Sequence, residues 1–474
     1  SLELQAKLNI TRKFTIMEIM ASLHIKMFLI TGLVMLSFAC SSSDSSSSSS
    51  PNITSQIQKD VTQVTKEEKN TSSAKAKTPN PEQTEQTEQV KPDIKSESTN
   101  NPDVKPTPIV SMPSESLQNT EVVCENMSTH IYCKSKDFPV VPKGVIPPWG
   151  EISNYSPEVF CATDLPDLVC PTITSSLIAA MIEWGSYSNV EYWILGSDKD
   201  AASKLTDLNC ERRDTTESLV YSGTQMPMKY CLEKHGPSGD HGFESYRKLG
   251  EDAINQGQPM GSMGLNGERD WGIHYFTSSI PFGLTDHFPF IGGGQEQKGA
   301  FHEYFHAVQH SYIQTTDRNK RDELLGLVWF VEGGAEYMAQ VKYFDSISSG
   351  IIQPVNADGP EKSPYKFKEN MRNKLLGGKD SVKYNCPGST IKDFSYQNSC
   401  NNAGYDLGAW AIAYLDNKAG ENSLIDTFYP NLDDLGWEGA FNLTYGMSSE
   451  DFYSDFESFL KLPISEQMKI LPDK

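Results

Sequence analysis

Aromatic residues, glycine and cysteine are all missing from one long stretch of the chain, residues 41–119. Serine, threonine, proline, lysine, glutamate and glutamine dominate that stretch. A segment of this composition cannot bury enough apolar surface to offset the conformational entropy that an ordered chain loses. We therefore predict a disordered linker over residues 41–120, and a folded part of the protein that begins near Glu121.

Positive charge is also scarce in this protein. The 474 residues include 41 Lys and Arg against 62 Asp and Glu, which gives a formal net charge of −21. Because proteins bind the phosphates of nucleic acids with basic surfaces, this balance argues against a nucleic-acid partner. It leaves the fold class open, since net charge bears on solubility and association rather than on architecture.

The N-terminal region lacks a hydrophobic run that spans a bilayer comfortably. Residues 27–39 are mostly apolar, Lys26 precedes them and Cys40 follows, but a spanning helix needs about 20 such residues. This segment resembles a bacterial lipoprotein signal peptide. The resemblance implies that residues 1–40 are an upstream segment plus signal peptide, and that Cys40 is lipidated and anchors the chain to a membrane. It implies export to the outer membrane or cell surface; secretion after plain cleavage is the alternative.

The cysteines lack the C-x-x-C spacing that is typical of cysteine-ligated zinc. Besides Cys40 there are eight of them, and an even number in an exported chain favours disulfide bonds. Their close spacing suggests neighbouring pairs. The predicted pairs are Cys124–Cys133, Cys161–Cys170, Cys210–Cys231 and Cys386–Cys400.

Only nine histidines are present, yet His302, His306 and His310 follow one another at intervals of four residues. On a helix, His302 and His306 lie one turn apart on the same face, so both rings can bind one metal ion, with Glu303 beside them. Apolar side chains nearby recur at roughly helical spacing, which would bury the other side of the helix. They are Phe301, Tyr304, Phe305 and Val308.

Three side chains could complete this metal site: His310, Glu332 and Glu336. A catalytic zinc site uses three protein ligands and keeps a fourth position open for water. Three successive turns of a straight helix place His302, His306 and His310 in a row about 12 Å long. Such a row is too extended for one ion with bonds near 2 Å, so we place His310 behind the ligands or in the core.

Glu332 is the predicted third ligand, from a second helix. Gly333 and Gly334 follow it, and glycine removes side-chain bulk where two helices must come close enough to share an ion. Glu336 lies one turn later and points the same way. We predict that it accepts a hydrogen bond from the ring of one ligand histidine and so fixes the orientation of that ring.

These residues resemble a known family. His302-Glu-Tyr-Phe-His306 with Glu332-Gly-Gly-Ala-Glu336 is similar to the gluzincin metallopeptidases, the thermolysin-like superfamily, and among them to collagenase-type members with an EGGAE segment. The resemblance implies one Zn²⁺ per chain, a protein or peptide substrate, and Glu303 as the general base that activates a water molecule.

A third segment, Tyr405-Asp-Leu-Gly408-Ala, resembles the helix start Y-x-x-G-A of gluzincin aminopeptidases. The resemblance implies that Tyr405 donates a hydrogen bond to the tetrahedral intermediate; an ordinary buried helix over residues 405–415 is the alternative. The exopeptidase loop G-x-M-E-N of those enzymes is matched only by residues 261–266, which lack its glutamate. An endopeptidase is therefore favoured over an exopeptidase.

The predicted architecture is an α+β peptidase, with an upstream half that contains strands, the zinc helix, and a mostly helical C-terminal half. Residues 121–170 form a Cys-containing N-terminal extension, and residues 171–474 the catalytic domain. Helices are expected at residues 173–184, 201–211, 241–256 and 449–460, and strands at residues 190–195 and 271–278.

Two features around the expected cleft depend on the resemblance. In gluzincins the edge strand before the zinc helix pairs with the substrate backbone, and residues 271–278 are the candidate for it. His274 and His287 could line the cleft, although a structural role is the more common one for a lone histidine. Residues 292–294, three glycines, are expected to form a mobile rim of the cleft.

The rival to a peptidase is a surface lipoprotein that keeps the scaffold without turnover and acts in binding or adhesion. The intact set of His302, Glu303, His306 and Glu332 argues against that alternative, because a protein without catalysis has no chemical need for Glu303.

Overall fold

The computed structural model describes residues 121–474 except residues 143–144, 146, 188, 215–226, 237–241, 258–262, 269–272, 289–290 and 362–364. The predicted linker, Cys40, Gly261 and Trp271 lie outside the described residues. The described elements combine many helices with a mixed sheet, which is compatible with the predicted α+β class. No described helix is both long enough and apolar enough to cross a membrane.

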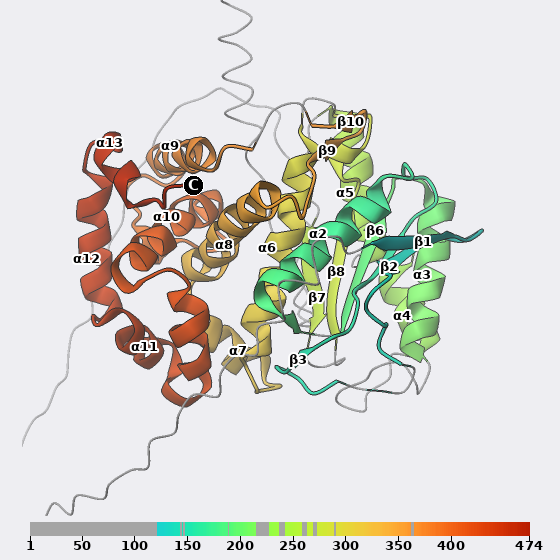
Figure 1. The fold of residues 1–474 in the computed structure, drawn as a ribbon, viewed down its shortest axis with the longest axis horizontal. Coiled ribbons are helices and arrows are strands. Elements are labelled where there is room, and N and C mark those ends of the chain that lie inside the picture. Colours follow the sequence, from blue (N-terminus) through green and yellow to red (C-terminus); the bar gives the residue numbers. More distant parts are fainter. Residues whose placement is uncertain are drawn as a thin grey trace, which may run out of the picture. The chain divides into compact units, whose positions relative to one another are not determined.

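Six strands form the main sheet in the order β1-β2-β4-β6-β8-β7 (Figure 1). Strands β4, β6 and β8 run parallel to one another, and the other pairings are antiparallel. Every residue of β6 and β8 is buried, as expected for central parallel strands that are covered on both faces. The strands are β1 (Val122–Asn126), β2 (Ile131–Ser135), β4 (Glu158–Cys161), β6 (Val190–Leu195), β7 (Met263–Glu268) and β8 (Ile273–Ser279).

The strand before the helix that carries His302 and His306 is not at the edge of the sheet. β8 pairs with β6 on one side and with β7 on the other, so the prediction that residues 271–278 form the substrate-pairing edge is wrong. Among the described strands, β7 is the outer one on this side. Its sequence, Met-Gly-Leu-Asn-Gly-Glu, contains two glycines and has weak strand propensity, so its pairing with β8 was not evident from local sequence.

Helices flank the sheet and make up most of the chain after β8 (Figure 1). Their bounds are α2 (Val169–Trp184), α3 (Lys199–Asp214), α4 (Met228–His235), α5 (Phe243–Gln256), α6 (Gly293–Ser311), α7 (Arg318–Leu325), α8 (Val328–Ser348), α9 (Phe367–Asn385), α10 (Asn401–Ala419), α11 (Leu432–Tyr445), α12 (Ser449–Leu460) and α13 (Ile464–Gln467). The predicted strand at residues 190–195 and helix at residues 449–460 coincide with β6 and α12. The other predicted elements differ from the structure by a few residues at their ends.

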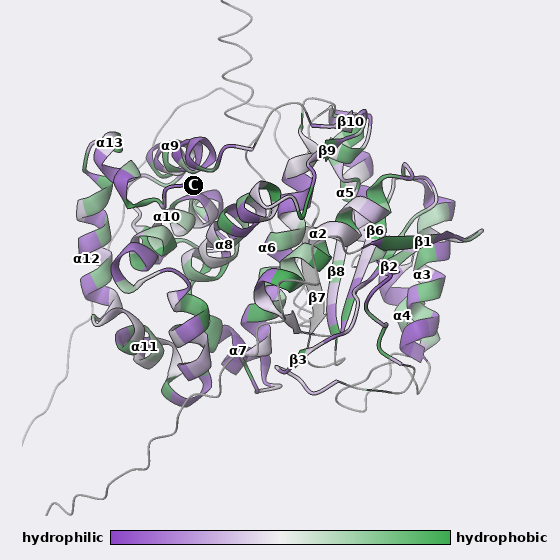
Figure 2. Cartoon of the chain, in the orientation of Figure 1, coloured by the Kyte–Doolittle hydropathy of each residue, from purple (hydrophilic) through white to green (hydrophobic). Residues whose placement is uncertain are grey.

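The distribution of apolar residues along each helix determines how deeply it is buried. In Figure 2 the helices α3 and α12 alternate between hydrophilic and hydrophobic residues along their length. The buried residues of α12 recur at helical spacing, which gives that helix one apolar face; they are Phe452, Tyr453, Phe456 and Phe459. Helices α6, α8 and α10 are instead buried over most of their length. Helix α6 contacts α2 and α8, and α8 in turn contacts α10.

Disulfide bonds join the four cysteine pairs that the spacing predicted. Cys124–Cys133 links β1 to β2, and Cys161–Cys170 links β4 to α2. Three strands of residues 121–170, namely β1, β2 and β4, belong to the same sheet as β6 and β8, whereas β3 (Ile152–Ser153) pairs with β5 (Ser186–Tyr187) in a separate two-stranded sheet. Four disulfides indicate that the protein folds in an extracellular or otherwise oxidising environment.

The start of α6 is buried rather than exposed at a cleft rim. The small hairpin of β9 (Val355–Asn356) and β10 (Gly359–Pro360) covers it, and Asn356 accepts a hydrogen bond from the backbone N–H of Gly293 at 2.7 Å. A Cβ atom at Gly293 would overlap the carbonyl oxygen of Val355. Residues 292–294 thus lie beneath the hairpin rather than at an open rim, and their mobility stays a prediction. Gly293 and Gly294 open the helix, and the lack of a side chain at Gly293 allows the hairpin to approach it.

Candidate metal site

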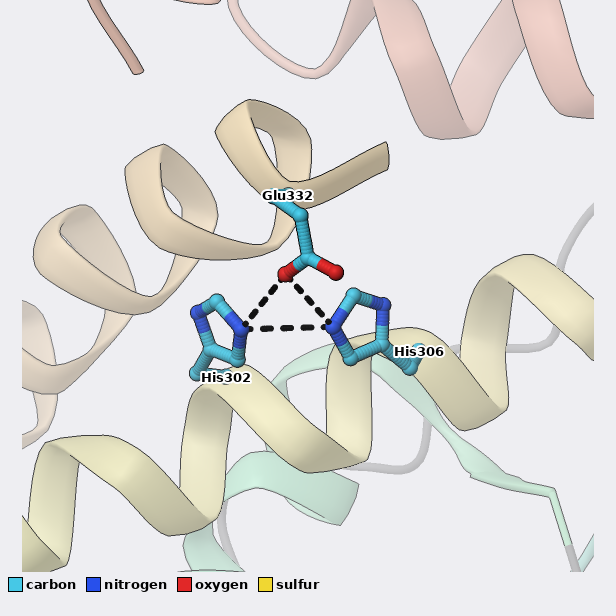
Figure 3. Close-up of side chains that lie close together, drawn as sticks. All are labelled: His302, His306 and Glu332. Atoms are coloured by element: carbon cyan, nitrogen blue, oxygen red, sulfur yellow. Dashed lines mark hydrogen bonds and ion pairs between the residues drawn. The ribbon is translucent and has the colours of Figure 1, made fainter. Parts of the chain in front are cut away.

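Two helices bring three potential metal ligands together. His302 and His306 lie one turn apart on α6, and Glu332 points toward both of them from α8 (Figure 3). All three side chains are buried. Among the described residues, they are the group of His, Cys, Asp and Glu side chains whose ligand atoms could hold a metal ion.

The spacing of the three ligand atoms fits a small tetrahedral ion. The Nε2 atoms of His302 and His306 are 3.2 Å apart, and Oε2 of Glu332 lies 3.3 Å from each. Ligands at the corners of a tetrahedron with bonds of about 2.0–2.1 Å are about 3.3 Å apart. One ion can therefore contact all three atoms at normal bond lengths, without rearrangement of either helix.

The chemistry of the donors leads to the same conclusion. Nδ1 of His302 faces the carboxylate of Glu336 at 3.1 Å, and Nδ1 of His306 faces Oε1 of Gln309 at 2.7 Å. Both partners are acceptors, so each Nδ1 carries a hydrogen, which leaves Nε2 of each ring to act as the metal ligand. The two Nε2 atoms and a carboxylate oxygen converge on one point. A positive charge between the three atoms, whether a proton or a metal ion, stabilises this arrangement.

A buried charge network lies behind His302. Besides the ring of His302, the Glu336 carboxylate accepts hydrogen bonds from Lys298 at 2.6 Å and Gln340 at 2.7 Å, and Lys374 lies 3.0 Å away. Burial would raise the pKa of Glu336, but the two lysines outweigh it and hold that pKa well below its usual range. Glu336 is therefore ionised and orients His302, as predicted for one of the two ligand histidines.

The same carboxylates act on His302 itself. Burial alone would lower the pKa of His302, but hydrogen bonds to Glu332 and Glu336 outweigh it and raise that pKa to about 9. Burial would raise the pKa of Glu332, whereas the two histidines lower it. Both shifts express the same preference of this pocket for a positive charge between the rings and Glu332.

A neutral amide, that of Gln309, faces Nδ1 of His306. The Gln309 amide, whose oxygen faces His306, donates from Nε2 to the carbonyl oxygen of Val331 and to the hydroxyl of Tyr429, both at 3.0 Å. The hydrogen bond to Val331 assigns the amide orientation, because a carbonyl oxygen can only accept. Gln309 thus ties α6 to the first turn of α8 at the level of the metal site.

The structure places Glu303 and Tyr405 next to the ligands. Glu303 is buried, and its charge is close enough to contribute to the raised pKa of His302. The ring of Tyr405, on the second turn of α10, stacks on the ring of His302 with centroids 6.0 Å apart and planes 19° from parallel. The three segments that carry the family resemblance therefore meet at one place.

The three other histidines considered from the sequence, His310, His274 and His287, lie outside the ligand group. His310 is buried at the C-terminal end of α6, where burial, followed by the charges of His306 and His274, lowers its pKa to about 3. His274 is also buried; its ring packs against that of Trp149 with centroids 4.6 Å apart and planes tilted by 33°, and it contacts the hydroxyl of Ser311 at 3.1 Å. His287 is exposed in a turn. His274 thus has the structural role that was the alternative to lining a cleft.

The two glycines after Glu332 serve different neighbours. Gly334 faces α6, where an added Cβ would lie 3.3 Å from Nε2 of Gln309. Gly333 faces α10, where an added Cβ would overlap the backbone of Gly408. The predicted close approach of the two helices thus applies to Gly334, which faces α6. Gly333 instead allows α10, the helix that carries Tyr405, to pack closely against α8.

Sequence reasoning missed four side chains around the ligands. The hydroxyl of Tyr396 donates a hydrogen bond to Oε1 of Glu332. The other three are Lys298, Lys374 and Gln309. Lys298 and Gln309 lie four residues before His302 and three after His306, and helical spacing could have indicated them. Nothing in the local sequence connects Lys374 or Tyr396 with the motif.

No protein-family model, curated protein or solved structure matches this chain. The resemblance to gluzincins thus depends on the short motifs, and the assignment of function depends on the site itself.

Proposed function

We propose that this protein is a zinc-dependent endopeptidase whose metal is held by His302, His306 and Glu332. The observation that carries the proposal is the convergence of two imidazole nitrogens and one carboxylate oxygen, each 3.2–3.3 Å from the others, beside a buried glutamate. Three protein ligands of this type, with room for a fourth, are typical of catalytic rather than structural zinc sites.

The residues around the metal supply the steps of peptide hydrolysis. Zinc bound there would act as a Lewis acid and lower the pKa of water toward neutrality. Glu303 takes the proton of the attacking water on a carboxylate oxygen and delivers it to the leaving nitrogen. Tyr405, stacked on His302, donates its hydroxyl hydrogen to the oxyanion of the substrate. One carboxylate thus serves first as base and then as acid.

The sheet edge offers a place for an extended substrate. β7 is the outer described strand on the side of β8, and it contacts α6. A peptide that adds to this edge by backbone hydrogen bonds would pass along the helix that carries the two histidines. The proposed location is the bacterial outer membrane or cell surface, with Cys40 as the lipid anchor and residues 41–120 as the tether.

Replacement of Glu303 tests the catalytic proposal. Glu303→Gln keeps the size and hydrogen-bonding capacity of the side chain but removes the base. We expect the variant to bind one zinc ion per chain as the wild type does, and to lose peptide cleavage by at least about 10²-fold, because general base catalysis typically contributes 10²–10⁴-fold. Metal content and cleavage of a peptide library, with substrates blocked at either terminus, provide the measurements.

The two alternatives give different results in that assay. Stoichiometric zinc in the wild type with no cleavage that depends on Glu303 would refute the enzyme and favour a binding protein on the same scaffold. Cleavage that requires a free substrate terminus would favour an exopeptidase.

A further inference from the structure

Tyr396 lies in a loop that joins α9 to α10 and contacts the metal site from outside both of its helices. The hydroxyl of Tyr396 donates to Oε1 of Glu332, while Oε2 of the same carboxylate faces the two histidines. The dashed contacts in Figure 3 accordingly reach only one of the two carboxylate oxygens. The phenol therefore engages the oxygen that the ligand group does not use.

This division of the carboxylate has a consequence for coordination. A carboxylate can bind a metal through one oxygen or through both, and the second mode would occupy the position that a catalytic zinc site keeps for water. A hydrogen bond to Oε1 competes with metal coordination by that oxygen, and it also restrains rotation of the carboxylate. Tyr396 thus favours binding through Oε2 alone.

A disulfide and several hydrogen bonds restrain the loop that carries Tyr396. The disulfide Cys386–Cys400 closes it at the ends of α9 and α10. On one side of the tyrosine, Phe394 is buried; on the other, Asn398 accepts from the backbone N–H of Cys400 at 3.0 Å and donates to the carbonyl of Asp393 at 2.7 Å. Tyr396 itself is 37% exposed, so it lies between Glu332 and solvent.

We propose that Tyr396 is a positioning residue that holds Glu332 as a one-oxygen metal ligand, and that the Cys386–Cys400 disulfide keeps it in place. The inference rests on the proposed metal site, not on the identity of the substrate. It assigns to a disulfide loop, which none of the sequence motifs includes, a part in setting the affinity and coordination of the metal.

The test compares two tyrosines at this end of the molecule. Tyr396→Phe removes only the hydroxyl that contacts Glu332, and Tyr384→Phe removes the hydroxyl of an exposed tyrosine that contacts Lys383. We expect Tyr396→Phe to lower the affinity for zinc by about 10–100-fold, the usual effect of losing a hydrogen-bond partner of a metal ligand. Tyr384→Phe should bind zinc as the wild type does. Competition with a chelator gives the affinities.

Coordination is measured separately, with Co²⁺ in place of zinc. The visible absorption of the Co²⁺ form should change in Tyr396→Phe, because a carboxylate free to bind through both oxygens alters the ligand number, and should be unchanged in Tyr384→Phe. The double variant Cys386→Ser/Cys400→Ser should shift both readouts in the direction of Tyr396→Phe. Thermal unfolding in the presence of chelator shows whether each variant is folded.

The outcomes separate this inference from the proposed function. Equal zinc affinity and an equal Co²⁺ spectrum in Tyr396→Phe and wild type would overturn the role of Tyr396 and leave the peptidase proposal standing. Weaker zinc binding by Tyr396→Phe in a protein that cleaves no peptide would support the role of Tyr396 and refute the peptidase. A wild-type protein that binds neither metal would overturn both.

Discussion

His302 and His306 present the same atom to the metal site from adjacent turns of α6, yet their surroundings differ in charge. On the His302 side, an ionised carboxylate, Glu336, contacts the ring and is itself contacted by Lys298 and Lys374. On the His306 side, the partner is the neutral amide of Gln309. We call these the charged side and the neutral side of the site.

Charge balance explains why the two sides differ. A divalent ion bound here would be neutralised by Glu332 and Glu303, so any further buried carboxylate needs a cation of its own. The charged side has such cations, because Lys298 and Lys374 face Glu336. A second carboxylate, Asp406, lies 3.0 Å from Lys374 and balances the other positive charge. A carboxylate partner makes a histidine a stronger ligand. Of the two histidines, only His302 has a carboxylate partner, and it is the one on the side where lysines are present.

Of the substitutions considered, removal of the charge of Glu336 should have the largest effect on stability and on zinc affinity. Glu336→Gln retains the shape of the side chain but takes from buried Lys298 its carboxylate partner, while Lys374 keeps Asp406; breaking a buried ion pair typically destabilises a protein by about 3–5 kcal/mol. The zinc affinity of the folded variant should also fall by about 10–100-fold, because His302 loses its anionic partner. Chemical denaturation and chelator competition measure the two effects.

Glu183 supplies the matched control for that variant. It is a partly buried carboxylate whose lysine partner, Lys342, lies 3.6 Å away, and it is outside the ligand group. Glu183→Gln should leave zinc affinity unchanged and cost less stability. If Glu336→Gln bound zinc as tightly as Glu183→Gln does, the anionic partner of His302 would have no part in metal binding.

The sequence predicted that His302, His306 and Glu332 lie together, because most of that geometry is local. His302 and His306 share a face of one helix by virtue of their spacing, and the short motif around Glu332 supplied the third ligand and Glu336. The charged side as a whole was not predictable in the same way. Lys374 reaches Glu336 from α9, and only the packing of distant segments brings those two side chains together.

Long-range pairing also explains the failure at the sheet edge. Residues 273–279 have the composition of a strand, and the structure confirms that they form one. Whether a strand is central or at an edge depends on what pairs with it, and β7, with its two glycines, gives little indication of strand structure by itself. The element was predictable from its residues, but its place in the sheet was not.

The stability of the protein should depend on pH through His310, which lies one turn after His306 on α6. Burial, followed by the charges of His306 and His274, lowers the pKa of His310 to about 3. The unfolded chain therefore binds a proton at His310 that the folded chain does not between pH about 6.5 and about 3, so stability is present above pH 6.5 and is lost as the pH falls. Each such group costs about 1.4 kcal/mol per pH unit within that range.

His310→Gln removes that acid dependence, and His287→Gln is the control, because His287 is exposed. Chelator-treated protein is used, so that release of metal does not contribute. The difference in unfolding free energy between pH 6.5 and pH 4.5 should be smaller in His310→Gln than in the wild type, and unchanged in His287→Gln. An unchanged acid dependence in His310→Gln would show that the folded protein tolerates a proton at this position.

The smallest effect on the metal is expected from the partner of His306. Gln309→Met fills the same space but cannot accept from His306 or donate to Val331 and Tyr429. Stability should fall by about 1–3 kcal/mol, because buried polar groups lose their partners. Zinc affinity should fall by about tenfold, the lower end of the usual range, since a hydrogen bond to a neutral amide is roughly half as strong as one to a carboxylate. If instead chelator competition showed a greater loss for Gln309→Met than for Glu336→Gln, ring orientation rather than the charge of its partner would determine how tightly these histidines bind the metal.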